Sequence, residues 1–242
     1  LKYRILFGRH NSWLLQELKK KKFKSYSAVS EEIARHYSQF LQIDSVLSVE
    51  NVPRKFDLEE TNSNETIEIV YHGNCDRSRG LYIAAEAIGK ISEEYRLNLM
   101  LTGNAKEIRN LKKYISKKSY SNKVRFIDPV AVSDIVPKIA QYDLGLALFD
   151  ARKNKSLELA LPNKFFEYIQ AGLGVITGSS ESMLRVCREY GLGIEVSEFS
   201  SISLADTLSS IDRSEVQRLK IGASAAAKVY QSDNVKEKFL SR

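Results

Sequence analysis

The sequence predicts an α/β fold, a doubly wound parallel sheet with helices on both faces. From residue 66 onward, short runs rich in β-branched residues alternate with longer amphipathic stretches, and strands that alternate with helices build parallel sheets. The run LNLMLTG is apolar almost throughout, as expected for a strand buried on both faces. Hydrophobic residues make up 43% of the 242 residues, which is normal for a globular protein.

The expected elements follow in order from residue 66. Strands are expected at 66–73, 97–103, 123–128, 143–149, 173–177 and 192–196. Helices are expected at 79–94, 106–116, 132–141, 162–171 and 181–190, with further helices in the remainder. Ligands of such sheets bind beyond the carboxyl ends of the strands, where the strand order reverses. The loops expected to form a site follow Tyr71, Leu101, Ile127, Phe149 and Thr177.

Residues 1–52 show a different pattern. They contain short strand candidates at 4–7 and within 45–53, a helix candidate at 11–22, and a strand that leads into a helix within YSAVSEEIARHYSQF. Ser30 suits the N-cap of that helix. The segment is too short for a doubly wound domain, so we expect the tail of a domain that begins before this sequence. The polar stretch 53–65 is the expected linker to a ligand-binding domain at 66–228.

The charge favours polyanionic partners. A net charge of +7 and a pI near 9.2 are consistent with nucleic acid, an acidic membrane surface or a phosphorylated ligand. The dense basic run Lys19–Lys24 is either a membrane-surface patch or a solvated helix end. The sequence has no zinc spacing and no aromatic-rich basic strand motif, so we expect no nucleic-acid partner. Cys75 and Cys187 have no disulfide-framework or metal spacing, which suits the cytoplasm.

Cations stand at the starts of two expected helices. Lys164 lies in the first turn of one, and Arg77 and Arg79 lie where another begins. The positive end of a helix dipole disfavours a cation by up to ~1 kcal/mol, and a bound anion would reverse that effect. Gly73 and Gly80 would let backbone amides approach a phosphate closely. The pattern predicts a diphosphate site; the alternative is that each cation pairs with a nearby carboxylate.

Glu167 adds a second candidate contact to this site. On a helix, Asn163, Glu167 and Gln170 fall on one face, opposite Phe165 and Ile169. A carboxylate on that face can accept paired hydrogen bonds from a ribose diol. A solvent-facing helix surface is the alternative interpretation.

These stretches together resemble glycosyltransferases with the GT-B fold, of the broad family 4, group 1 type. LPNKFFEYIQAGLGVI resembles their signature, and VYHGNCDRSRGLYIAAEAI resembles the opening of their donor domain. YSAVSEEIARHYSQF and VENVP resemble the end of their acceptor domain, so the resemblance covers nearly the whole chain. It implies two Rossmann-like domains that face a cleft, the second of which binds a nucleotide-diphosphate sugar. It also implies that residues 229–242 form a helix that crosses back to the acceptor domain.

The resemblance assigns roles to particular positions. It implies diphosphate contacts from Gly73, Asn74, Arg77, Arg79, Asn163 and Lys164. It implies a ribose contact from Glu167, and proximity to the base for Gly103, Ile127 and Asp128. It implies no metal and no cofactor besides the donor, because basic side chains and helix dipoles neutralise the leaving diphosphate. A catalytic base would come mainly from the acceptor domain, so this chain alone is expected to bind donor but to transfer sugar poorly or not at all.

Two positions depart from the family pattern. Leu159 stands where the family usually has a second glutamate, with Glu158 one place away, and Asn74 replaces a usual arginine that Arg77 could supply. The implied activity is retaining transfer to a glycan or lipid-linked saccharide, in polysaccharide biosynthesis at the cytoplasmic face of a membrane. A sugar-nucleotide epimerase of the same fold and a degenerate binding module stay open as alternatives. For His72, in the glycine loop, a structural role and a phosphate contact are both open.

Overall fold

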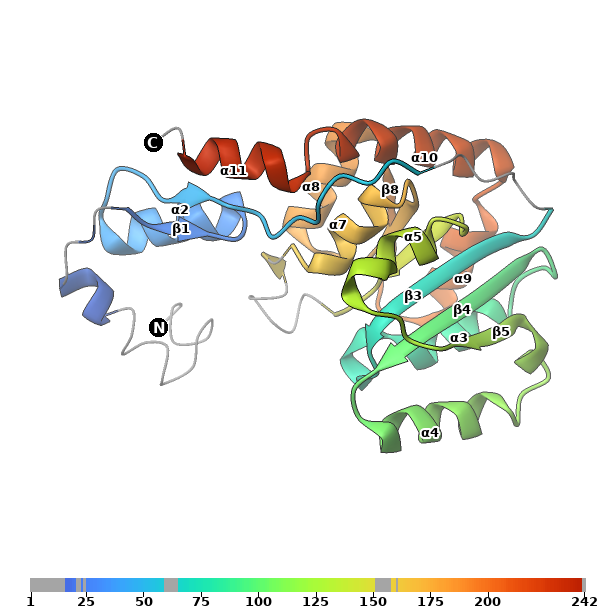
Figure 1. Cartoon of the computed structure of the whole chain (residues 1–242). Helices are drawn as coiled ribbons and strands as arrows, with labels where there is room; N and C mark the ends of the chain where they lie inside the picture. Colours follow the sequence, from blue (N-terminus) through green and yellow to red (C-terminus); the bar gives the residue numbers. More distant parts are fainter. Residues whose placement is uncertain are drawn as a thin grey trace.

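The structure is a computed structural model that describes residues 16–20, 23, 25–58, 65–150, 158–159 and 161–240. Its centre is a six-stranded parallel sheet in the order β5-β4-β3-β6-β7-β8 (Figure 1). The strands are β3 (Ile67–Asn74), β4 (Tyr95–Thr102), β5 (Val124–Ile127), β6 (Leu144–Ala147), β7 (Gly174–Thr177) and β8 (Gly193–Glu195). The strand order reverses between β3 and β6, the position where doubly wound sheets bind ligands. The predicted fold class is confirmed.

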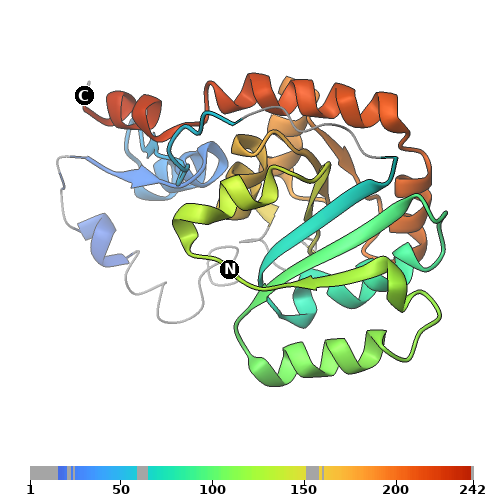
Figure 2. The same cartoon turned by 45° about the vertical axis from the view of Figure 1, so that its right-hand side comes forward.

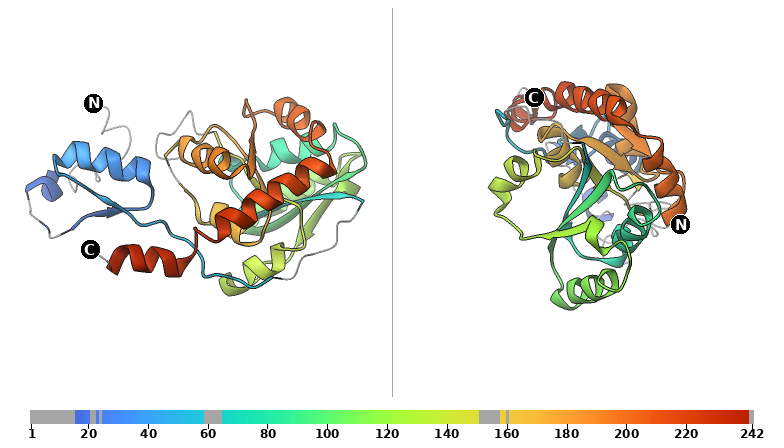
Figure 3. Two further views of the ribbon diagram at one scale, coloured as in Figure 1. Left: turned by 90° about the horizontal axis from the view of Figure 1, so that it is seen from above. Right: turned by 90° about the vertical axis from the view of Figure 1, so that its right-hand side faces the viewer.

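Helices cover both faces of the sheet and bury two hydrophobic clusters. One cluster is formed with α3 (Leu81–Ile88), α4 (Ala105–Ile115) and α9 (Ser201–Ser209). The other is formed with α5 (Ile135–Ile139), α7 (Asn163–Gln170), α8 (Glu181–Tyr190) and α10 (Arg213–Ala227). Figure 2 and the right panel of Figure 3 show α4 and α10 on opposite sides of the molecule. The predicted helix at 181–190 has the bounds of α8.

Two of the predicted helices are wrong in extent. The expected helix at 79–94 is a 3-10 turn, η1 (Arg77–Arg79), followed by the shorter α3. Gly80 separates them with a left-handed φ of 67°, and Gly89 follows the last turn of α3. A Cβ at Gly89 would lie 2.1 Å from the Tyr120 ring, so a distant side chain packs where the expected helix would continue. The expected helix at 132–141 is likewise a 3-10 turn, η3 (Val132–Asp134), followed by α5.

The N-terminal part is a small unit docked on the sheet domain. It consists of β1 (Ser27–Ala28) and β2 (Leu47–Ser48), which pair in parallel, and α2 (Glu31–Leu41). Ser30 caps α2 as predicted, because its side chain accepts a hydrogen bond from the Ile33 amide. Residues 16–20 of the expected helix at 11–22 are helical, and the expected strand at 4–7 lies outside the described residues.

A buried polar cluster joins this unit to α8. The Glu32 carboxylate accepts hydrogen bonds from Ser182 Oγ at 2.7 Å and Arg185 Nε at 2.8 Å. The Leu159 carbonyl accepts a hydrogen bond from Ser30 Oγ at 2.9 Å, and it also lies 2.8 Å from Ser182 Oγ, whose single proton is shared with Glu32. Glu32 and both serines are buried. The Arg185 side chain is 31% exposed and the Glu32 side chain is 6% exposed, so the ion pair is partly buried. The cluster links the N-terminal unit to α8 and to the backbone at Leu159.

The described part of the predicted linker is packed against the domain. Residues 53–58 have no regular secondary structure, but Phe56 and Leu58 contact the cluster that contains α7. The Pro53 carbonyl accepts a hydrogen bond from the Ser232 amide, the first residue of α11 (Ser232–Leu240). The division into an N-terminal tail, a linker, a domain and a terminal helix stays a prediction. Within the described ranges, no helix is long and apolar enough to cross a membrane.

Tyr168 fixes α7 above the point where the strand order reverses. Its hydroxyl donates a hydrogen bond to the Leu146 carbonyl at 3.2 Å and accepts one from the His72 amide at 3.4 Å. It therefore joins β6 to β3. The buried ring lies over Gly145, where a Cβ would be 2.2 Å from the nearest ring atom. The absence of a side chain at Gly145 thus sets the height of α7 above the sheet.

We expect Gly145→Ala to lower the free energy of unfolding by about 1–3 kcal/mol, the usual cost of overpacking a core. Chemical denaturation measures the change. Tyr168→Ala should cost less in the Gly145→Ala background than in the wild type, because the ring is what the new methyl group meets. Equal costs in the two backgrounds would contradict this packing account.

Candidate functional site

The site expected from the sequence lies at the carboxyl edge of the sheet. Asn74 at the end of β3 pairs in register with Thr102 of β4, and Met100 of β4 pairs with Ile127 of β5. Gly73, Gly103 and Ile127, which are far apart in the sequence, therefore share this edge. The first turn of α7 lies over the same end of β3, because Lys164 reaches across it.

Lys164 occupies the space above the glycine loop. Its Nζ lies 3.7 Å from the centre of the Tyr71 ring and 3.4 Å from the position that a Cβ on Gly73 would take. Gly73 has a φ of 118°, which side chains rarely adopt. The glycine therefore gives both the backbone shape and the room for the ammonium group, and the aromatic face beneath attracts it.

Two cations, Lys164 and Arg79, and one carboxylate, Glu167, interact at this edge. Burial and the nearby Arg79 guanidinium lower the pKa of Lys164 to about 7, although Glu167 acts in the opposite direction. Arg79 itself lies over the Phe149 ring, 5.9 Å from its centre. Because Lys164 is only partly protonated at pH 7, this edge holds less charge than two free cations would. An anion between Lys164 and Arg79 would restore the charge on the lysine.

Glu167 lies beside His72. Its Oε2 is 3.2 Å from His72 Nε2. Burial raises the pKa of the Glu167 carboxyl more than the Lys164 charge lowers it, so the pKa lies above its usual value. Burial and the Lys164 charge lower the pKa of His72 to about 3, so His72 is neutral at pH 7. Its ring packs edge-on against Tyr168, 5.1 Å between centres.

His72 and Tyr71 are site residues that the sequence analysis did not select. Successive side chains of a strand point to opposite faces, so Tyr71 faces the α3 side while His72 faces α7. This alternation was readable from the sequence. What it could not show was which helix residues would meet each face, because Glu167 lies 95 positions beyond His72.

The other predicted residues are placed less centrally. The Asn163 Oδ1 accepts a hydrogen bond from Asn51 Nδ2 at 2.9 Å, and Arg77 is exposed, with its Nε 3.9 Å from Glu107. The Asn74 side chain fills the space where Gly103 has no Cβ. Asp128 is exposed and Ile127 is partly buried in the core. The structure thus groups Arg79, Lys164 and Glu167 but does not bring Arg77 to them.

Gln170 corrects one expectation, and Leu159 has a structural position. Gln170 does not share the surroundings of Glu167, because it is buried and donates hydrogen bonds to the carbonyls of Ala227 and Tyr230, both at 2.8 Å. Leu159, at the position of the family's second glutamate, is only 3% exposed. Its backbone carbonyl takes part in the cluster with Ser30 and Ser182.

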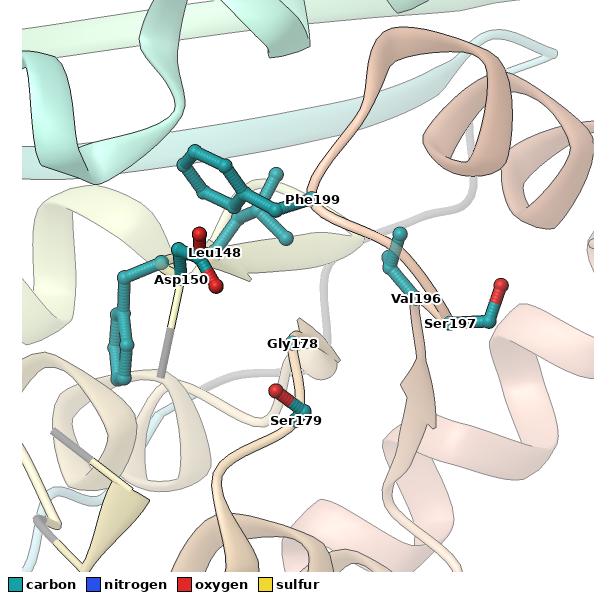
Figure 4. A pocket seen from close by; sticks show the side chains of 8 residues that line it. Leu148, Asp150, Gly178, Ser179, Val196, Ser197 and Phe199 are labelled. Atoms are coloured by element: carbon teal, nitrogen blue, oxygen red, sulfur yellow. The ribbon is translucent and has the colours of Figure 1, made fainter. Parts of the chain in front are cut away.

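A small pocket lies beside the site, beyond the ends of β6, β7 and β8 (Figure 4). It is lined by Leu148, Phe149, Asp150, Gly178, Ser179, Val196, Ser197 and Phe199. Phe149 belongs to both places, since its ring also lies under Arg79. Among the described residues, no group of three or more His, Cys, Asp or Glu side chains could hold a metal ion.

Comparison of the fold with solved structures identifies its architecture. HepE from Anabaena in complex with UDP superposes with a TM-score of 0.76 at 14% identity, over 97% of this chain and 67% of that one. A glycosyltransferase from Rickettsia africae gives a TM-score of 0.71 at 15% identity, over 90% and 62%. The C-terminal domain of LpcC, a group 1 family protein from Francisella tularensis, gives 0.57 at 15%, over 71% and 95%. The chain therefore has the GT-B fold and spans about two thirds of the longer relatives.

A search of curated proteins found no match. The family model for glycosyl transferases group 1 matches residues 66–211, which is more than half of the chain. That range begins one residue before β3 and ends just after α9, so it contains the whole sheet and the site described above. The chain therefore belongs to the group 1 glycosyl transferases.

Proposed function

We propose that the carboxyl edge of the sheet binds a nucleotide-diphosphate sugar, with the diphosphate between Arg79 and Lys164. One observation carries the proposal. Lys164 is held over Gly73 and Tyr71 close to a second cation, at a cost that lowers its pKa to about 7. A cation that is partly withdrawn from solvent is stabilised by an ion-pair partner, and Glu167 only partly fills that role. A diphosphate would complete it, together with free amides in the first turn of α7.

Glu167 is then the ribose contact and the β5 end is the base contact. The carboxylate can accept paired hydrogen bonds from two vicinal hydroxyls, and His72 on its other side limits its movement. Gly103, Ile127 and Asp128 lie along the same edge, where a base extending from the ribose would reach. HepE, which shares the fold, has been seen with UDP-glucose, and this supports a nucleotide-diphosphate donor.

We propose that the complete protein transfers the sugar to a glycan or lipid-linked saccharide, with retention and without a metal. The cations at the site support metal-independent departure of the diphosphate, since they can neutralise its charge. The family resemblance supports retention and supports an acceptor at the cytoplasmic face of a membrane.

The direct test is calorimetric titration of this chain with UDP, GDP and ADP. One of them should bind, and Glu167→Ala should weaken that binding by ~1.5–3 kcal/mol, the value of a hydrogen-bond pair to a charged group. Glu237→Ala, an exposed glutamate on α11, is the control and should bind like the wild type. If Glu167→Ala retained full affinity, the ribose assignment would be wrong.

A non-catalytic binding module is the second candidate, because Leu159 replaces the family's second glutamate with a buried apolar side chain. Turnover of donor by the complete protein separates the two. Transfer to an acceptor supports the enzyme, and tight donor binding without turnover supports the module. Release of free epimerised sugar would instead indicate an epimerase of the same fold.

A further inference from the structure

Helix α4 carries a cationic stripe on its outer face. We use this name for Lys106, Arg109, Lys113 and Lys117, the last of which lies in the turn after the helix. Their spacing of three or four residues places them on one side, opposite the buried Leu111 and Ile115. All four are exposed. Between residues 105 and 118 there are six Lys or Arg side chains and one acidic residue, Glu107.

The stripe has no acidic partners within the described structure. No carboxylate of the described residues forms an ion pair with any of its four members, and Glu107 lies near Arg77 instead. Of the two other cations here, Lys112 packs over the Phe126 ring and Lys118 over the Tyr114 ring. On the opposite side of the molecule, Arg213, Arg218 and Lys220 of α10 are each near a carboxylate.

An ordinary solvated helix face does not explain this pattern. Each like-charge pair three or four residues apart destabilises a helix by a few tenths of a kcal/mol, whereas an opposite-charge pair at that spacing stabilises it. The stripe contains three such pairs in succession. An anionic surface that lies along the helix would lower the repulsion among these cations. Such a surface can bind without a pocket in the protein.

We infer that the cationic stripe docks the protein on an anionic membrane surface. An array of charges along an 11-residue helix, about 16 Å long, suits a flat field of lipid phosphates. None of the large exposed hydrophobic residues lies between 105 and 118, so the contact is electrostatic and does not insert into the bilayer. The same absence of exposed aromatic rings removes the stacking surface that single-stranded nucleic acids use.

The position of α4 fits this role. The helix begins just after Gly103 at the carboxyl edge of the sheet and lies on the side opposite α10 and α11 (Figures 1 and 2). Docking through the stripe would therefore bring the carboxyl edge of the sheet close to the membrane surface without covering it. Lys19 and Lys20, from the basic run considered first, are already engaged by the Phe40 ring and by Glu17.

Vesicle co-sedimentation of this 242-residue chain tests the inference. Wild type should bind vesicles of phosphatidylglycerol mixed with phosphatidylcholine at low salt, should not bind pure phosphatidylcholine, and should be released as salt increases. The triple variant Lys106→Gln, Arg109→Gln, Lys113→Gln should bind on the order of 100-fold more weakly, as expected for three basic residues near an anionic surface. Its thermal midpoint should stay level or rise, because the repulsion within the stripe is removed.

The matched control removes three exposed lysines elsewhere, with Lys138→Gln, Lys228→Gln and Lys236→Gln. This control variant has the same net charge as the stripe variant. Its affinity for the vesicles should be at least tenfold higher than that of the stripe variant. Equal losses in both variants, or no binding of wild type at low salt, would overturn the inference. Stripe-dependent binding of single-stranded RNA without vesicle binding would also overturn it and would indicate a nucleic-acid partner. Nucleotide affinity should be unchanged in the stripe variant, which separates this test from the test of the donor site.

Discussion

Lys164→Met should abolish most nucleotide binding while making the unliganded protein more stable. Loss of a charge-assisted contact to the diphosphate is expected to weaken binding by ~1.5–3 kcal/mol, roughly 10- to 150-fold. A lysine whose pKa falls from 10.5 to about 7 in the folded state costs that state up to about 4 kcal/mol at pH 7. Methionine fills similar space without the charge, so it removes this cost. Calorimetry measures the affinity, and denaturant unfolding measures the stability.

The pH dependence of that stability gain distinguishes a titrating lysine from better packing. Between pH 7 and 10.5 the unfolded chain binds more protons at Lys164 than the folded chain, so the stability of the wild type rises with pH. The advantage of Lys164→Met should thus be largest near pH 7 and shrink toward pH 10. Lys138→Met, at an exposed position on α5, should change neither property. A stability advantage that is constant with pH would refute the explanation from charge.

Nucleotide affinity should fall as the pH rises above 7. The free site holds Lys164 about half protonated at pH 7, and a bound diphosphate favours the charged form and raises its pKa. Binding above pH 7 therefore takes up a proton, and the affinity should fall by up to about tenfold per pH unit. Titrations at pH 7, 8 and 9, each in two buffers with different ionisation enthalpies, measure the affinity and the proton uptake.

His72 should not contribute to that profile, because its pKa of about 3 keeps it neutral over the whole range. The control is Lys164→Met, whose residual affinity should be nearly independent of pH between 7 and 9. Proton release on binding, or a steep profile in Lys164→Met, would show that another group titrates.

The order of the elements could be predicted because it depends on local pattern. The six strands were found from short apolar runs, the bounds of α8 from the amphipathic pattern, and the Ser30 cap from local capping chemistry. The extent of α3 could not be found, because the Tyr120 ring that packs against Gly89 comes from another part of the chain. The burial of Gln170 could not be predicted for the same reason. Its hydrogen-bond partners, Ala227 and Tyr230, belong to the end of α10 and the turn after it.

The sequence predicted which cations belong to the site, but it did not predict how they are arranged in space. Charge at the helix starts indicated Lys164 and Arg79, and the structure places them at one edge with Glu167. Arg77 was selected for the same reason as Arg79, its place at a helix start, yet its side chain is exposed near Glu107. The aromatic floor under Lys164 and the neutral His72 beside Glu167 depend on register between strand and helix, which one sequence does not show.

The polar cluster around Glu32 also limits how the N-terminal unit can move relative to the sheet domain. Residues 27–48 are bonded to the sheet domain through Glu32, Ser182 and Arg185. A rotation of this unit about the segment that follows β2 would break these bonds and bring the Glu32 side chain, now 6% exposed, into water. We therefore expect the N-terminal unit and the sheet domain to move together as one body.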